Sequence, residues 1–147
     1  MIVKIVNKSK HENPKYATIK SSGLDLKADI PAPIIISPME RAIIPTNLYI
    51  QLSEGYEAQI RPRSGLAAKS GITVLNSPGT IDNDYTGHIQ VILINLSSNE
   101  FIVNDGDRIA QMVIAPFVQI DFKNVDDVIE FDQTERASGG FGSTGKN

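Results

Sequence analysis

The hexapeptide YEAQIR (residues 56–61) points to the fold class. Its apolar and polar residues alternate, and this is the period of a half-buried β-strand rather than that of a helix. Short apolar runs bounded by proline and glycine lie on both sides of it. These runs are residues 34–36, 42–44, 48–52, 91–94, 101–103 and 109–114. Many short strands at such spacing predict an all-β sandwich, jelly roll or barrel.

Two stretches depart from the strand pattern. Residues 64–71 (SGLAAKSG) begin with Ser64, a residue type that caps helices, and close on Gly71, so they predict one helix of about two turns. A second helical turn is predicted near residues 125–129. The composition becomes polar and then glycine-rich beyond Asp132. We therefore expect a single domain of residues 1–132 followed by a flexible arm of residues 133–147.

Length, charge and composition exclude several classes of protein. The chain has 147 residues, a net charge of −3 and no cysteine, so disulfides and thiolate metal sites are excluded. Its basic residues do not cluster, and we therefore expect no stable nucleic-acid binding. The longest apolar runs, such as residues 91–94, are too short to span a bilayer, and residues 1–10 lack the apolar stretch of a signal peptide. We expect a soluble, cytoplasmic protein that does not bind membranes.

The run VILI at residues 91–94 is apolar on both faces of its predicted strand. Such a strand is covered on both sides, either by the core of its own chain or by another subunit.

Two arginines lie just before the predicted helix. Arg61 and Arg63 flank Pro62 at the end of the YEAQIR strand, and Ser64 follows. Arginine beside the free N–H groups of a helix N-terminus suits a phosphate. The alternative is an ordinary helix cap next to a solvated arginine.

Residues 76–87 (NSPGTIDNDYTG) carry two carboxylates, Asp82 and Asp84. On an extended segment their side chains share a face, where they could hold a metal or activate a water. An acidic surface loop is the alternative, and the spacing does not choose between the two carboxylates. Tyr85 is either a binding platform or the cover of a hairpin.

Other polar residues allow a plain structural interpretation. Asp25 stands between two leucines, where a carboxylate is more often a hydrogen-bond acceptor than a ligand. Arg108 and Gln111 are three residues apart and are expected on opposite faces of a regular strand. His11 and His88 are assigned neither to catalysis nor to metal binding.

Five stretches in order resemble the motifs of the trimeric deoxyuridine triphosphate pyrophosphatases (dUTPases). They are residues 21–28, 61–72, 76–87, 106–114 and 136–145. The resemblance implies a jelly-roll-like β-barrel with one short helix, and a homotrimer whose three active sites each take motifs from all three chains. It also implies hydrolysis of dUTP to dUMP and pyrophosphate with Mg²⁺, which limits uracil in DNA and supplies dUMP for dTMP synthesis.

The resemblance also implies a role for individual residues. Asp82 is the expected general base, and Asp25 is expected to position Mg²⁺ through water. Residues expected at the uracil and deoxyribose are Asn76, Gly79, Thr80, Ile81, Tyr85 and Gln90, of which Tyr85 excludes a 2′-hydroxyl. Residues expected at the triphosphate are Arg63, Ser64, Gly65 and Gln111. The arm is expected to close over the nucleotide with Arg136, Phe141, Gly142, Ser143 and Thr144.

Three other interpretations remain open at this point. A deoxycytidine triphosphate deaminase shares the fold, although residues 136–145 and the Asp-x-Asp-Tyr sequence at residues 82–85 argue against it. The second is a nucleotide-binding protein without catalysis. The third is a structural jelly-roll subunit, which would have no nucleotide affinity.

Overall fold

Antiparallel strands account for most of the regular structure in the computed structural model, which describes residues 1–134 and 137–139. The strands are β1 (Lys4–Asn7), β2 (Leu24–Lys27), β3 (Ile34–Ile36), β4 (Arg41–Gln51), β5 (Tyr56–Arg61), β6 (Ile72–Val74), β7 (Gly79–Ile81), β8 (Ile89–Asn95), β9 (Phe101–Val103) and β10 (Arg108–Pro116). The helices are α1 (Ser64–Ser70) and the short 3₁₀ helix η1 (Val128–Glu130).

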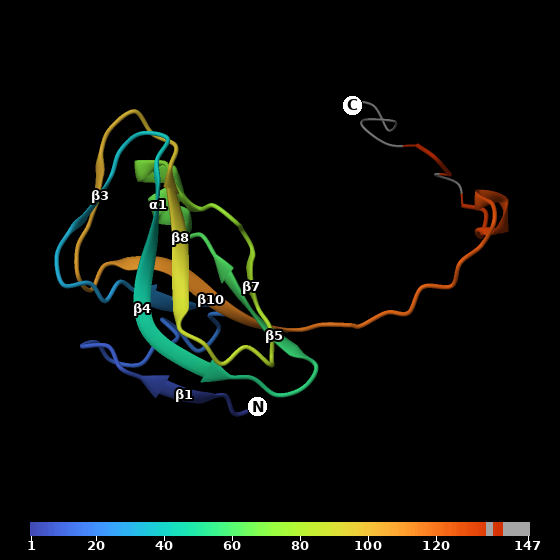
Figure 1. The fold of residues 1–147 in the computed structure, drawn as a ribbon, viewed down its shortest axis with the longest axis horizontal. Coiled ribbons are helices and arrows are strands. Elements are labelled where there is room, and N and C mark those ends of the chain that lie inside the picture. Colours follow the sequence, from blue (N-terminus) through green and yellow to red (C-terminus); the bar gives the residue numbers. More distant parts are fainter. Residues whose placement is uncertain (135–136, 140–147) are drawn as a thin grey trace.

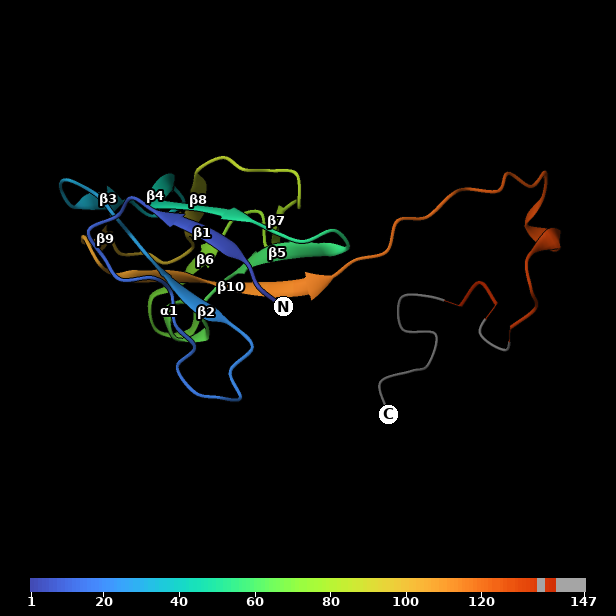
Figure 2. The same cartoon turned by 90° about the horizontal axis from the view of Figure 1, so that it is seen from below.

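Two four-stranded sheets form the two layers of the domain (Figures 1 and 2). Their strand orders are β1-β4-β8-β6 and β2-β10-β5-β7, and β3 and β9 form a small third sheet. This arrangement confirms the predicted all-β, jelly-roll-like class. Among the described residues no strand pairing closes either four-stranded sheet on itself, so the layers are open sheets.

The core lies between the sheets and follows the alternation of the strands. In β4 the buried side chains are Ile44, Thr46, Leu48 and Ile50, each separated by one residue. The YEAQIR stretch is β5, as predicted, and it buries Ala58 and Ile60.

The doubly apolar run in β8 is covered unequally. Val91 and Leu93 are buried in the core, whereas Ile92 and Ile94 on the other face are only half-buried. Ile43 of the neighbouring strand is 58% exposed on the same sheet. Cover on both faces was predicted, and within this chain the outer face has it only in part.

One strand replaces the two predicted at residues 42–44 and 48–52. The strand β4 continues through Pro45, and its register against β8 shifts between Pro45 and Leu48. Asn47 has a left-handed backbone there, with φ 52°. A proline and a left-handed residue normally end a strand, but an irregularity of this kind accommodates both.

The predicted helix is present as α1. Gly71 ends it in the left-handed conformation, with φ 64°, and donates to the carbonyl of Ala67. The prediction that Ser64 caps the helix was wrong: Arg63 is the N-cap residue, and no side chain caps it. The second predicted helical turn corresponds to η1.

The chain leaves the two sheets after β10 (Figure 1). Alternate residues Val118, Ile120 and Phe122 are 85%, 67% and 87% exposed. None of the described helices has the length and apolar character needed to cross a membrane.

Candidate functional site

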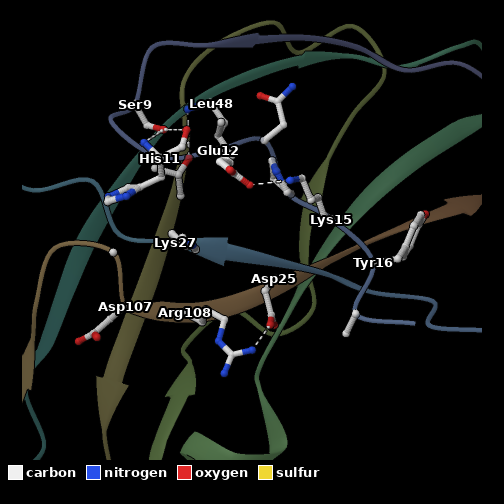
Figure 3. A pocket seen from close by; sticks show the side chains of 15 residues that line it. Ser9, His11, Glu12, Lys15, Tyr16, Asp25, Lys27, Leu48, Asp107 and Arg108 are labelled. Carbon is white, nitrogen blue, oxygen red and sulfur yellow. Dashed lines mark hydrogen bonds and ion pairs between the residues drawn. The ribbon is translucent and has the colours of Figure 1, made fainter. Parts of the chain in front are cut away.

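Asp25 on β2 is held between two arginines. Arg63 Nε lies 2.9 Å from one carboxylate oxygen, and Arg108 Nη1 lies 3.1 Å from the other. Figure 3 shows Arg108 pointing toward Asp25. The side chain of Asp25 is 29% exposed, and that of Arg63 is 24% exposed. A half-buried carboxylate between two guanidinium groups is fixed in position and compensated in charge.

The register of β10 explains why these side chains meet. This strand lies between β2 and β5, and Gln111 is the cross-strand partner of Asp25. A bulge between Arg108 and Ala110 lets Ile109 and Ala110 both face the core. Arg108 and Gln111 therefore reach the same face, and the prediction of opposite faces was wrong because it assumed a regular strand. Arg108 was not among the predicted site residues, and only the bulge reveals it.

Gln111 is packed tightly beside Asp25. Its Nε2 donates to the carbonyl of Pro62 at 2.9 Å. A Cβ at Gly23 would lie 2.3 Å from Gln111 Oε1, so a larger residue there would displace this amide. Ser64 and Gly65 follow on the first turn of α1 and are exposed. The predicted phosphate-binding residues of the described chain thus lie around the start of α1 and the adjoining strands.

The loop from β7 to β8 connects the two four-stranded sheets and is not a hairpin, because β7 pairs with β5 whereas β8 pairs with β4 and β6. This β7–β8 loop and its flanking strands line a pocket that is separate from Asp25. It has a volume of about 270 Å³. The predicted residues that line it are Thr80, Ile81, Asp82, Tyr85 and Gln90. Ile43, His88 and Ile92 also line it and were not predicted. Two of these are apolar residues of the outer sheet face, a position that no motif marks.

Asp82 and Asp84 do not share a face. The N–H of Tyr85 donates to the carbonyl of Asp82 at 3.2 Å, so the segment turns where an extended chain was assumed. Asp82 lines the pocket beside Tyr85, whereas Asp84 lines another pocket with Glu54 and Phe117. The turn separates two carboxylates that the spacing alone placed together.

Gly79, Tyr85 and Gly87, in and around the β7–β8 loop, are closely packed. Gly79 is buried, and a Cβ there would lie 3.1 Å from Asn76 Nδ2. Tyr85 is 45% exposed and donates its hydroxyl to the carbonyl of His88 at 3.0 Å. Its ring would lie 2.5 Å from a Cβ at Gly87, so a larger residue at position 87 would displace the ring.

The two groups of residues lie at opposite edges of one sheet. Asp25 is on β2, at one edge, and Asp82 directly follows β7, at the other. Three strand spacings separate these edges, which is about 14 Å. Within one chain, the two carboxylates therefore cannot contact the same phosphate.

A larger pocket adjoins Asp25, between residues 9–17 and the strands β2, β4 and β10 (Figure 3). Its volume is about 560 Å³, and Asp25, Lys27 and Arg108 line its floor. Lys15 and Glu12 form an ion pair at 2.5 Å in the segment that covers it.

Behind this pocket His11, Asp29 and Asp105 bring their ligand atoms within 4.8 Å of one another. The ammonium of Lys10 lies 3.1 Å from Asp105 and supplies positive charge to the cluster. The backbone N–H of Ile30, followed by Lys10, lowers the pKa of Asp105 to about 2. The cluster ties residues 10 and 11 to the turn that precedes Arg108.

The predicted residues of the arm, namely Arg136, Phe141, Gly142, Ser143 and Thr144, lie outside the described residues.

Sequence comparison gives a consistent result over nearly the whole chain. Residues 9–145 match the family model described as dUTPase. A deoxyuridine 5′-triphosphate nucleotidohydrolase of Finegoldia magna is 51% identical, over 99% of this chain and 99% of the relative. The enzyme of the same name from Neorickettsia sennetsu is 60% identical over 91% of this chain and 88% of its own length.

Solved structures agree on the fold. The dUTPase of Staphylococcus bacteriophage 80alpha with dUPNHPP has a TM-score of 0.86 at 24% identity, with 98% of both chains covered. A mutant dUTPase from phage phi11 of S. aureus, described with a structural Mg(II) ion, has a TM-score of 0.78 at 21% identity, covering 86% of this chain and 98% of that one.

Proposed function

The chain belongs to the dUTPase family, and on that premise we propose that it hydrolyses dUTP to dUMP and pyrophosphate. The observation that carries the proposal is that the chain has two distinct sets of side chains. One offers arginines and amide groups for a triphosphate, and the other offers a carboxylate beside an aromatic pocket. In the cytoplasm, this reaction would limit uracil incorporation into DNA and supply dUMP for dTMP synthesis.

Asp82 is the general base in this proposal. It is exposed, it lies beside Tyr85, and no lysine or arginine of the described residues forms an ion pair with it. An oxygen free of cationic partners can accept the proton of a water that attacks the α-phosphate in line. Asp84 lines a different pocket and has no part in the reaction.

Arg63, Ser64, Gly65 and Gln111 bind the triphosphate in this proposal. The guanidinium is already fixed by Asp25, so little freedom is lost when it binds a phosphate. Arg63 and the exposed N–H groups at the start of α1 would stabilise the charge that develops on the phosphate oxygens.

The residues present fit Mg²⁺ held through water. Asp25 provides a single carboxylate, and each oxygen accepts from one arginine, which leaves acceptor capacity for a water. Mg²⁺ usually keeps several waters and binds one or two carboxylates together with substrate phosphates. When bound, the ion would neutralise phosphate charge.

Uracil and deoxyribose occupy the pocket at the β7–β8 loop in this proposal. Asn76, Gly79, Thr80, Ile81 and Gln90 line the base, and Tyr85 lies under the sugar. The ring of Tyr85 is fixed by Gly87 and by the carbonyl of His88, so crowding by a rigid ring would exclude a 2′-hydroxyl. Phe141 and Arg136 of the arm would then cover the base and the terminal phosphate, with Gly142, Ser143 and Thr144 beside them.

Each active site is shared between copies of the chain in a homotrimer. The separation of about 14 Å across the sheet supports this, because Asp25 and Asp82 of one chain cannot contact the same phosphate. The half-covered outer face of β8, with Ile43 exposed beside it, offers an apolar surface for a second copy. Val118, Ile120 and Phe122 offer a further apolar stripe beyond β10.

Pyrophosphate release from dUTP, dCTP and UTP in parallel, with Mg²⁺ present, tests the proposal. We expect release from dUTP alone and a solution mass of three chains. Ammonia from dCTP would instead indicate a deaminase. No turnover of any nucleotide would contradict the enzyme assignment.

A further inference from the structure

His88 contacts the neighbouring strand β4 through two interactions of its side chain, and Tyr85 of its own loop through one backbone interaction. Its Nε2 accepts the backbone N–H of Asn47 at 2.8 Å. Its ring stacks on Tyr49 with 5.5 Å between centroids and 26° between planes. Its carbonyl accepts the hydroxyl of Tyr85 at 3.0 Å. One residue therefore connects the ring of Tyr85 to the middle of β4.

The N–H of Asn47 is available because the ladder is interrupted. The register between β4 and β8 shifts between Pro45 and Leu48, and Asn47 lies inside this shift. A backbone N–H without a ladder partner must find another acceptor, and the imidazole supplies it. The irregularity in β4 and the histidine are thus complementary.

Asn47 makes two further hydrogen bonds. Its side-chain amide donates to the buried carboxylate of Asp29, and its carbonyl accepts the N–H of Lys8 at 2.9 Å. Asp29 belongs to the cluster with His11 and Asp105. The β7–β8 loop is therefore connected through Asn47 to Asp29 and to the backbone of Lys8.

We propose that His88 is a positioning residue, which holds Tyr85 against the sugar and so sets the affinity for dUTP and the exclusion of UTP. This inference rests on the proposed function.

Two substitutions separate the hydrogen bond from the ring contact. His88→Phe keeps the aromatic ring against Tyr49 but has no acceptor, and His88→Gln keeps an acceptor oxygen but has no ring. At pH 8 we expect His88→Phe to raise KM for dUTP about threefold to tenfold, the range for one lost hydrogen bond, with kcat little changed. Its preference for dUTP over UTP should fall as well. His88→Gln should keep a KM and a preference near those of wild type.

A His88→Phe enzyme with wild-type KM and wild-type selectivity would overturn the proposal.

Amide exchange of Asn47 gives a readout that needs no turnover. Exchange should be faster in His88→Phe than in wild type or His88→Gln, and equal rates in all three would refute the contact. Absence of pyrophosphate release by wild type would count against the proposed function, whereas altered exchange without altered selectivity would count against the positioning role alone.

Discussion

Asp25 and Asp82 are both predicted site carboxylates, yet their surroundings differ in every respect. Asp25 is half-buried in a sheet and accepts from two arginines. Asp82 is exposed after β7, beside Tyr85, and no cation of the described chain pairs with it. They lie at opposite edges of one sheet.

This difference separates their chemical roles. A carboxylate whose two oxygens both accept from guanidinium groups is held in a fixed position. A carboxylate without cationic partners, next to an aromatic surface, can orient a water and take its proton. The environment therefore favours Asp82 as base and Asp25 as the group that positions the phosphate-binding side.

The largest effect is expected from Asp82→Asn. Loss of the base should lower kcat by about 10²- to 10⁴-fold while dUTP still binds, because the amide is isosteric. Single-turnover kinetics and nucleotide binding measure the two quantities separately. Asp84→Asn is the matched control and should remain active. Near-normal turnover by Asp82→Asn would show that the two carboxylates do not divide their roles in this way.

A mixing experiment tests whether the two carboxylates serve one site from different chains. Asp25→Asn and Asp82→Asn proteins should each be nearly inactive. After joint refolding in equal amounts, about a quarter of the sites should contain both native carboxylates if neighbouring copies in a closed ring contribute them. Recovered pyrophosphate release measures that fraction. Mixed oligomers without recovered activity would place both carboxylates of a site on the same chain.

The smallest effect concerns the cluster that supports the Asp25 side. Asp105 has a pKa of about 2, below its ordinary value of 3.8. A lowered carboxyl pKa adds stability that is complete above about pH 4 and is lost as the pH falls toward 2. Asp105→Asn should therefore lower Tm at pH 6, and the difference from wild type should shrink below pH 4.

Asp121→Asn is the control for that measurement, since no ion pair or hydrogen bond of its side chain occurs among the described residues. Its Tm should follow wild type at every pH. A constant difference between Asp105→Asn and wild type down to pH 2 would rule out the linkage.

Local pattern was sufficient where neighbours in sequence determine the structure. The alternation in residues 56–61 predicted β5, and the runs at 34–36 and 101–103 predicted β3 and β9 with the correct bounds. Gly71 predicted the end of α1, because glycine has no Cβ and adopts the left-handed conformation that ends a helix.

Pattern failed where distant strands impose the geometry. The pairing with β8 carries β4 through Pro45, although proline and a left-handed residue suggest a break. The bulge in β10 brings Arg108 to Asp25, against the regular alternation. The turn at residue 82 places Asp82 and Asp84 in different pockets, whereas their spacing did not distinguish the two carboxylates.

The sequence by itself determined the all-β class, the helix and the order of the five motifs, because periodicity, turn residues and motif spacing are local properties of the chain. Only the tertiary structure decided which side chains meet, because register, bulges and strand order place residues distant in sequence side by side. Thus Asp25 lies between two arginines, Asp82 lies at the opposite edge of the same sheet, and His88 accepts the N–H of Asn47 where the register between β4 and β8 shifts.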